Sequence, residues 1–232
     1  MFSPILSESA INTRPMTKLQ LPDQIPLFPL SGTLLLPGGN LPLHIFEQRY
    51  LDMINDSLQQ DRIIGMIQPR MRESYMHEPP ICTTGCAGYI THHDDTPDGC
   101  KQITLSGLYR FNIVTELDTD HLYRVAKVHY LTPDNTGKAS DNNAVGDDKI
   151  SRLMHSLSAY LPMLDTDINA QQLQGNQSAK MVNKLAMYCP FSAMEKQALL
   201  EAANLDARTD MLIDLIERSL LENWHSDESL LN

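Results

Sequence analysis

The sequence has no apolar run long enough to cross a membrane. Hydrophobic residues make up 42% of the 232 residues, but no stretch approaches the ~20 consecutive apolar residues that a transmembrane helix needs. Residues 1–20 also lack the basic start and long apolar segment of a secretory signal. We therefore predict a globular cytoplasmic protein that makes no membrane contact, with residues 1–20 as a flexible leader.

Basic residues are also scarce. The chain has 18 Lys and Arg against 29 Asp and Glu, which gives a formal net charge of −11, and both halves of the chain are acidic. Such a charge repels phosphate backbones, and no Lys/Arg stripe offsets it. The balance argues against nucleic-acid binding and favours a neutral or basic polypeptide partner.

Cysteine is rare as well, with four residues at no regular spacing: Cys82, Cys86, Cys100 and Cys189. A scaffold stapled by disulfides would need more cysteines, more evenly placed, so a reducing cytoplasm fits the sequence best. Cysteine and histidine do gather in one region, which contains five possible zinc ligands: Cys82, Cys86, His92, His93 and Cys100.

The spacing of that group does not favour a shared ion. If residues 82–86 are extended, Cys82 and Cys86 lie on one face of the strand and roughly 13 Å apart at ~3.3 Å per residue. They could bind one metal only if the backbone bends at Gly85. Buried cysteines and solvated loop histidines are the simpler interpretation, so we predict no metal and no cofactor. His44 is interpreted as an ordinary strand histidine, and the aspartates at 94, 95 and 98 as a solvated hairpin tip.

Motifs for catalysis are missing too. A P-loop requires Gly-Lys followed by Ser or Thr, whereas Gly137-Lys138 is followed by Ala139. No Gly-x-Ser-x-Gly elbow occurs. We therefore expect no enzymatic activity and no catalytic residues. A cysteine-based or metal-dependent enzyme or regulator that uses the region 82–100 stays open as an alternative, because catalytic partners meet only in the fold.

What the sequence does contain is a proline- and glycine-punctuated run at Ile25–Leu51. Apolar stretches at 25–30, 34–36 and 41–45 are separated by turn-forming residues and predict three short strands. Pro26, Pro29 and Pro42 lack an amide donor, which places their strands at edges, strand starts or bulges. After Ile45 the apolar period changes to that of an amphipathic helix.

The rest of the chain divides into a β-rich part and a helical part. Further strand patterns lie at 81–90, 101–106, 109–116 and 123–131, and the connection at 92–99 predicts a hairpin. A polar segment over 132–148 resembles a linker, and helical periods follow over 149–222. Ser192 and Glu195 have capping-box spacing, and Asp206 is a candidate N-cap for the last helix. We predict an α+β fold: a bent sheet or pseudo-barrel over 21–131 with one packed helix, a linker over 132–148, a helical bundle over 149–222 and a flexible tail over 223–232.

The run at 25–51 also resembles a known family. Ile-Pro-Leu-Phe-Pro-Leu, Leu-Leu-Pro-Gly and Leu-Pro-Leu-His-Ile-Phe-Glu-Gln-Arg-Tyr are similar to the opening of the Lon N-terminal domain family. Later elements match in order, including Ile64-Gly65-Met66-Ile67, Gly85 to Ile90, the Gly-x-x-Arg-Phe element ending at Phe111, and Arg208. The resemblance implies a stand-alone version of the substrate-binding module of ATP-dependent Lon proteases.

The resemblance implies a function in protein quality control. We expect binding of unfolded or exposed hydrophobic polypeptide segments, and an interaction with a protease or chaperone partner. The sequence-based candidates for the binding surface are Phe28, Phe46, Met66 and Tyr89. An adaptor that recognises one folded protein is a second alternative.

Overall fold

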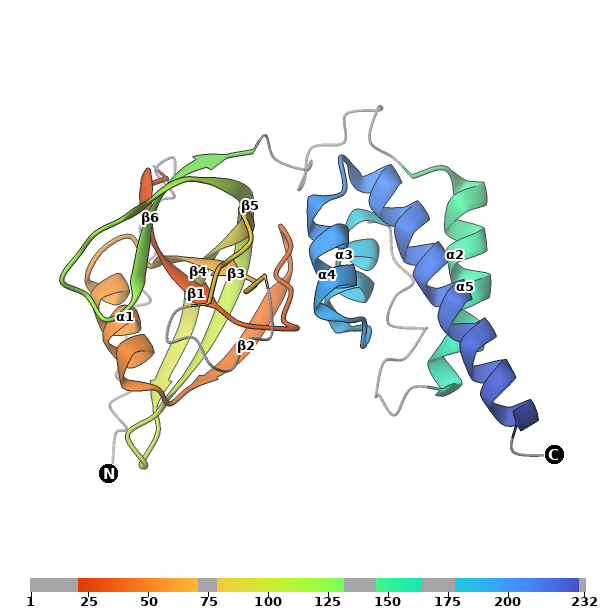
Figure 1. Cartoon of the computed structure of the whole chain (residues 1–232), viewed down its shortest axis with the longest axis horizontal. Helices are drawn as coiled ribbons and strands as arrows, with labels where there is room; N and C mark the ends of the chain where they lie inside the picture. The colour runs from red at the N-terminus through yellow and green to blue at the C-terminus, as the bar shows by residue number, and fades with distance from the viewer. Residues whose placement is uncertain (1–20, 71–78, 132–144, 164–177, 230–232) are drawn as a thin grey trace, which may run out of the picture.

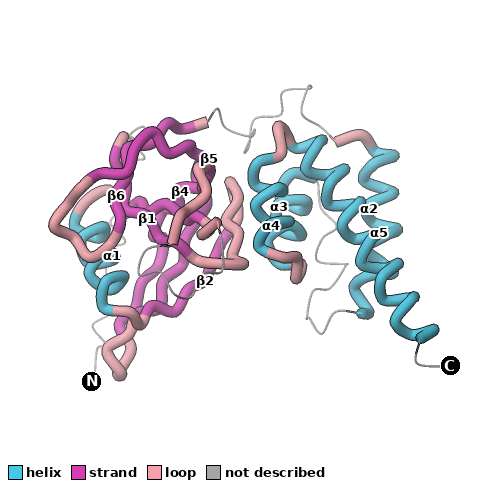
Figure 2. The backbone as a smooth tube through the Cα atoms, in the orientation of Figure 1, coloured by secondary structure: helices cyan, strands magenta, loops and turns pink. Residues whose placement is uncertain are grey.

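The chain folds into a β-lobe and a helical lobe that lie side by side (Figure 1). The computed structural model describes residues 21–70, 79–131, 145–163 and 178–229, and within these the side chains of 178 and 223–229 are excepted. The described strands all lie in the first lobe with one helix, and the other helices form the second (Figure 2). The predicted α+β architecture is therefore confirmed. No helix in the described part of the chain is both long and apolar enough to span a membrane.

One sheet closes on itself to form the β-lobe. Its strands are β1 (Gln24–Pro29), β2 (Asn40–Ile45), β3 (Ile63–Ile67), β4 (Thr84–Asp95), β5 (Lys101–Leu117) and β6 (Arg124–Tyr130). They follow the order β2-β5-β4-β3-β1-β6, and β6 also pairs with β5. The pairs are antiparallel except β1 with β3. Five strands therefore form a ring, and β2 lies outside this ring, paired with the first part of β5.

Helix α1 (Gln48–Gln59) packs on this ring through the apolar face that the sequence predicts. Tyr50 and Ile54 are buried, and Met53 between them is fully buried. The rings of Phe28 and Tyr50 meet with centroids 4.4 Å apart. The hydroxyl of Tyr123 donates to the Asp56 carboxylate at 2.7 Å, which ties the polar side of the helix to the sheet.

The prolines lie where a missing amide costs no pairing. Pro42 is on β2, which pairs with β5 alone. β1 lies between two strands, yet its Pro26 is in register only with β6 and its Pro29 only with β3. The prediction of an edge strand is confirmed for β2, which carries Pro42, and is wrong for β1, which lies between β3 and β6.

The prediction of a strand at 34–36 is wrong. Residues 33–36 are irregular, yet Leu34, Leu35 and Leu36 are all buried in the core. The segment passes so close to β5 that a Cβ on Gly107 would overlap the Leu36 carbonyl oxygen and lie 2.8 Å from its carbon. A buried apolar run that packs across a sheet has the same composition as a strand, so periodicity alone does not distinguish them.

Two further boundaries differ from the prediction. The strand patterns at 101–106 and 109–116 belong to one strand, β5, which pairs first with β2 and then with β6. β4 runs on to Asp95, so the hairpin tip is shorter than the connection expected at 92–99.

The helical lobe contains α2 (Asp147–Tyr160), the short η1 (Leu161–Met163), α3 (Ser178–Tyr188), α4 (Ala193–Glu201) and α5 (Leu205–Ser229). The capping box at the start of α4 is confirmed, because Ser192 and Glu195 each bond the other's backbone amide. The predicted N-cap at Asp206 is wrong. Helix α5 begins earlier, where the Asn204 side chain accepts the Ala207 amide at 2.8 Å. It also continues to Ser229 and so includes most of the predicted tail, whereas residues 132–144 of the predicted linker lie outside the described residues.

The capping box predicts a measurable loss of stability. We expect Ser192→Ala to lower the free energy of unfolding by about 1 kcal/mol, because one of the first free amides of α4 loses its acceptor. For a chain of this size that is a fall in melting temperature of about 2–4 °C. The control is Ser158→Ala on α2, whose exposed hydroxyl donates to the His155 carbonyl within its own helix. Equal melting temperatures for the two variants would contradict the prediction.

Both lobes share one hydrophobic core. A continuous cluster of buried apolar side chains runs from the ring and the 34–36 segment into the four helices of the second lobe. Polar contacts reinforce it: the buried Arg110 of β5 donates through Nη1 to the carbonyl oxygens of Leu200 at 2.8 Å and Ala202 at 2.7 Å. Lys196 of α4 donates to the Gly32 carbonyl at 3.0 Å. The helical lobe is therefore packed directly against the β-lobe.

Candidate functional site

Among the described strands, β2 alone has no neighbouring strand along the whole of one edge. Each of the other five strands pairs on both sides for at least part of its length, whereas β2 pairs only with β5. An unpaired edge presents free backbone donors and acceptors, which an extended polypeptide can use as an added strand.

Hydrogen bonds at the start of β2 show which residues face the open edge. The Gly107 amide donates to the Gly39 carbonyl at 2.8 Å, so residue 39 faces β5. The Asn40 carbonyl points the other way and accepts the Tyr188 hydroxyl at 3.2 Å. Because backbone groups alternate along an antiparallel strand, Pro42 and His44 face the open edge. The proline leaves a carbonyl but no amide there, while His44 offers both.

An open depression lies on the solvent face of the same sheet. It has a volume of about 320 Å³ and is lined by residues of β2, β4 and β5: Pro42, Leu43, His44, His92, Gln102, Ile103 and Thr104. Register explains the grouping, because His44 lies opposite Gln102 and Pro42 opposite Thr104, which in turn lies opposite His92. Phe46 follows directly, with its ring centroid 6.3 Å from that of His44. We call this set together with Phe46 the β2 surface.

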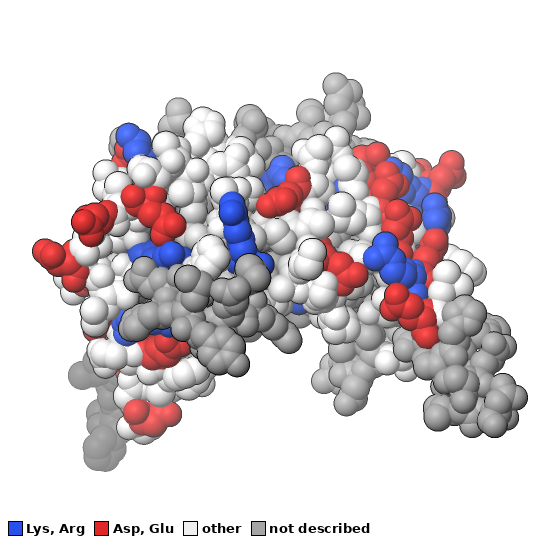
Figure 3. Space-filling view, in the orientation of Figure 1, with Lys and Arg blue, Asp and Glu red and all other residues white. Residues whose placement is uncertain are grey.

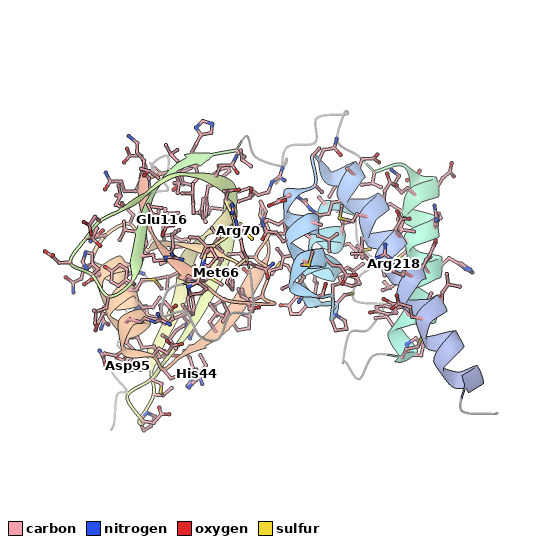
Figure 4. The ribbon with its side chains drawn as sticks, viewed as in Figure 1. His44, Met66, Arg70, Asp95, Glu116 and Arg218 are labelled. Carbon is pink, nitrogen blue, oxygen red and sulfur yellow. The ribbon has the colours of Figure 1, made fainter. Side chains whose placement is uncertain are left out.

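Acidic side chains border the β2 surface at the β4–β5 hairpin. Figure 4 places His44 and Asp95 at the same end of the β-lobe, where the hairpin projects. The Asp94 carboxylate pairs with His92 at 2.8 Å, and Asp95 pairs with Lys101. Asp98 accepts from the Thr96 hydroxyl, and this hydrogen bond lowers the pKa of Asp98. Figure 3 shows acidic groups on the same lobe. These aspartates give this end of the β-lobe a negative potential, which attracts basic groups.

The four residues predicted from sequence for polypeptide binding are not brought together. Phe28 is 5% exposed and Met66 is 3% exposed, so both support the core and offer no contact surface. Tyr89 is half-buried and packs on the cluster inside the ring. Phe46 is 67% exposed and borders the depression. Of the four, Phe46 alone has both exposure and a place on the β2 surface.

The five candidate metal ligands are separated as well. Cys86 is buried in β4 opposite Met66 and Arg110, and Cys82 precedes that strand. His92, His93 and Cys100 lie near the other end of the β4–β5 pair. Among described residues, one group of three potential ligands does converge: His44, Asp98 and Cys100, whose ligand atoms lie within 4.8 Å of one another. Spacing along the chain did not reveal it, because His44 reaches the hairpin only through the pairing of β2 with β5.

Cys82, Cys100 and Cys189 lack the character of activated nucleophiles. Burial raises the pKa of the Cys189 thiol to about 12 and also raises the pKa of Cys82. For Cys100, desolvation and then a hydrogen bond to Asp98 raise the pKa of the thiol. The thiolate is the reactive form, and a reactive cysteine normally has a lowered pKa. These three side chains are therefore protonated at neutral pH.

Two solved Lon N-terminal domains have a similar fold. The structure is similar to that of a Lon N-terminal domain protein from Xanthomonas campestris, with a TM-score of 0.60 and 24% identity over 82% of this chain and 97% of that chain. It also resembles the N-terminal domain of the Mycobacterium avium complex Lon protease, with a TM-score of 0.57 and 15% identity over 84% of this chain and 98% of that chain.

Comparison of the sequence with known families shows the family to which the chain belongs. Residues 24–218 match the ATP-dependent protease La (LON) substrate-binding domain, and the chain belongs to this family. Lon protease 2 of Myxococcus xanthus is 26% identical over 206 residues, which is 88% of this chain. The Lon protease of Anaeromyxobacter dehalogenans is 24% identical over 215 residues. The chain spans about a quarter of the length of these relatives, 24% in each case.

Proposed function

We propose that this chain binds extended, unfolded polypeptide segments at the β2 surface and has no catalytic activity of its own. The observation that carries the proposal is the open edge of β2 beside a depression and an exposed phenylalanine. Its family, described by substrate binding, supports the same conclusion. The four cysteines are free thiols, as a reducing cytoplasm would leave them.

The β2 surface sets the chemistry of the segment that it accepts. Phe46, Pro42 and the depression provide apolar contact, which rewards aromatic and aliphatic side chains. The backbone of His44 can pair with an extended chain, but Pro42 removes a donor and limits this pairing to a short stretch. The aspartates of the hairpin favour basic residues beside the apolar ones. We therefore infer a client segment that is extended, apolar and flanked by Lys or Arg, which the chain could deliver to a protease or chaperone.

The test is a binding measurement with one protein in its folded and its unfolded form. A small basic protein, reduced and alkylated so that it stays unfolded, should bind, and its native form should not. Fluorescence anisotropy of the labelled client gives both affinities. Equal binding of the native form would instead indicate an adaptor for folded proteins.

Phe46→Ser should weaken binding of the unfolded client about 5–30-fold, because loss of a large aromatic contact from a binding surface costs ~1–2 kcal/mol. Folding should be unaffected, since Phe46 is exposed. The matched control is Leu221→Ser on α5, which removes an apolar side chain of similar exposure, 64%, from the other lobe. Unchanged affinity in the Phe46 variant, or an equal loss in the Leu221 variant, would place the binding surface elsewhere.

A further inference from the structure

Three potential metal ligands, one from β2 and two from the β4–β5 connection, converge beside the hairpin. His44 comes from β2, Asp98 from the turn after β4, and Cys100 from the residue before β5. Ile45 pairs with Lys101 and His44 with Gln102, so the end of β2 lies against the start of β5. Residues 44, 100 and 102 fall on the same face of the sheet because side chains alternate along a strand. The grouping therefore follows from the strand pairing.

The three side chains form a coherent donor set. An imidazole nitrogen, a thiolate sulfur and a carboxylate oxygen are the ligands of Zn²⁺ and of chemically similar divalent ions. Three protein ligands with water in the fourth position is a common arrangement for such ions. At metal–ligand distances of ~2.0–2.3 Å the ligand atoms of a tetrahedral site are roughly 3.5 Å apart. From separations of up to 4.8 Å, a movement of about 1 Å closes the site.

Little packing opposes this movement. His44 and Asp98 are exposed, and Cys100 is half-buried at the mouth of the turn. The Cys100 sulfur and an Asp98 carboxylate oxygen lie within 4.8 Å of each other, and Asp98 Oδ1 accepts from the Thr96 hydroxyl and, at 3.5 Å, from the Cys100 amide. The neighbouring carboxylates of Asp94 and Asp95 add negative potential.

We propose that His44, Asp98 and Cys100 bind one divalent ion of the zinc class, with water completing the coordination. On binding, the ion replaces the thiol proton, which passes to solvent, and sulfur, nitrogen and oxygen each donate one electron pair to the metal. The ion connects the end of β2 to the β4–β5 hairpin. This proposal is independent of polypeptide binding, because the ligands need no client.

Co²⁺ provides the test, since a thiolate bound to Co²⁺ gives a near-ultraviolet charge-transfer band and a four-coordinate ion gives strong visible bands. Metal-free, fully reduced protein without an affinity tag is titrated with Co²⁺ and then with Zn²⁺. We expect saturation at one equivalent and full displacement of cobalt by zinc. Saturating Zn²⁺ should also raise the melting temperature, because the ion binds the folded state alone. A titration without a charge-transfer band would overturn the proposal.

Variants distinguish this site from the possible zinc ligands that the sequence alone suggests, which also include Cys82 and His93. Cys100→Ser should abolish the charge-transfer band, and His44→Ala and Asp98→Asn should each weaken Co²⁺ binding by more than the ~10–100-fold that loss of an outer-sphere partner costs. Cys82→Ser and His93→Ala are the matched controls and should titrate as the unaltered protein does. Circular dichroism confirms that each variant is folded. Retention of the band in Cys100→Ser, loss of it in Cys82→Ser, or unaltered affinity in His44→Ala would each refute the assigned ligands.

Discussion

Gly107→Ala will destabilise the whole chain, with an expected loss of about 3 kcal/mol or more in the free energy of unfolding. A Cβ at this position would overlap the carbonyl oxygen of Leu36. Backbone cannot move aside as a side-chain tip can. The segment that follows Leu36 is also held against β5 by two hydrogen bonds. The Gly38 amide donates to the Gly107 carbonyl at 2.9 Å, and the Gly107 amide donates to the Gly39 carbonyl at 2.8 Å.

The consequence should extend beyond the site of substitution. The segment held at Gly107 carries Leu34, Leu35 and Leu36 into the core that both lobes share. Displacing it also moves the start of β2, and with it the open edge. We therefore expect Gly107→Ala to lower both stability and client binding, as measured by urea denaturation and by anisotropy.

Gly146→Ala is the matched control for this experiment. Gly146 precedes α2, has no atom within 4 Å of an added Cβ, and does not have the positive φ that favours glycine. Gly146 is the N-cap of α2, a position where alanine is less favourable than glycine, so we expect alanine there to cost about 1 kcal/mol or less. If both variants unfold at the same urea concentration, the close approach of Leu36 to β5 is not as the structure shows.

The glycine, arginine and phenylalanine of the element at 107–111 show how far a sequence pattern can be taken. The sequence showed that these residues resemble a family motif, but it did not show the structural role of each one. Gly107 admits the Leu36 backbone, Arg110 binds carbonyls of the other lobe, and Phe111 fills the ring against Gly65 and Gly85. Local propensity predicts strands and helices from neighbours along the chain, whereas each of these tasks depends on a partner tens of residues away.

The candidate site was predictable only in part for the same reason. The proline-rich run indicated an edge strand, and Pro42 on β2 confirms it. Burial within that run was harder to infer, because Phe28 and Phe46 have similar apolar neighbours in sequence, yet Phe28 is buried against Tyr50 of α1 and Phe46 is exposed. His44 had no sequence neighbour that marked it as a ligand, since Asp98 and Cys100 reach it through strand register.

Arg208→Met should cost about 3 kcal/mol or more of stability, although methionine is close in size and more apolar. Arg208 is fully buried at 0% exposure. Its Nε donates to the Leu199 carbonyl at 2.8 Å and its Nη1 to Asn183 Oδ1 at 3.0 Å. Methionine removes both donors and leaves two buried acceptors unsatisfied, each at a cost of ~1–3 kcal/mol. Methionine has no charge, so the cost of burying the guanidinium charge disappears, and this offsets part of the loss.

The effect should reach the β-lobe, because Asn183 also donates to the Pro37 carbonyl at 3.0 Å. Arg208 thereby positions a side chain that spans the two lobes. Arg218→Met on the same helix is the matched control: its guanidinium is exposed and lies 3.8 Å from Glu195, so we expect a change below about 0.5 kcal/mol. Urea denaturation should give a lower midpoint for Arg208→Met in a single transition. A transition in which the helical lobe unfolds alone would show that the two lobes are not coupled through Asn183.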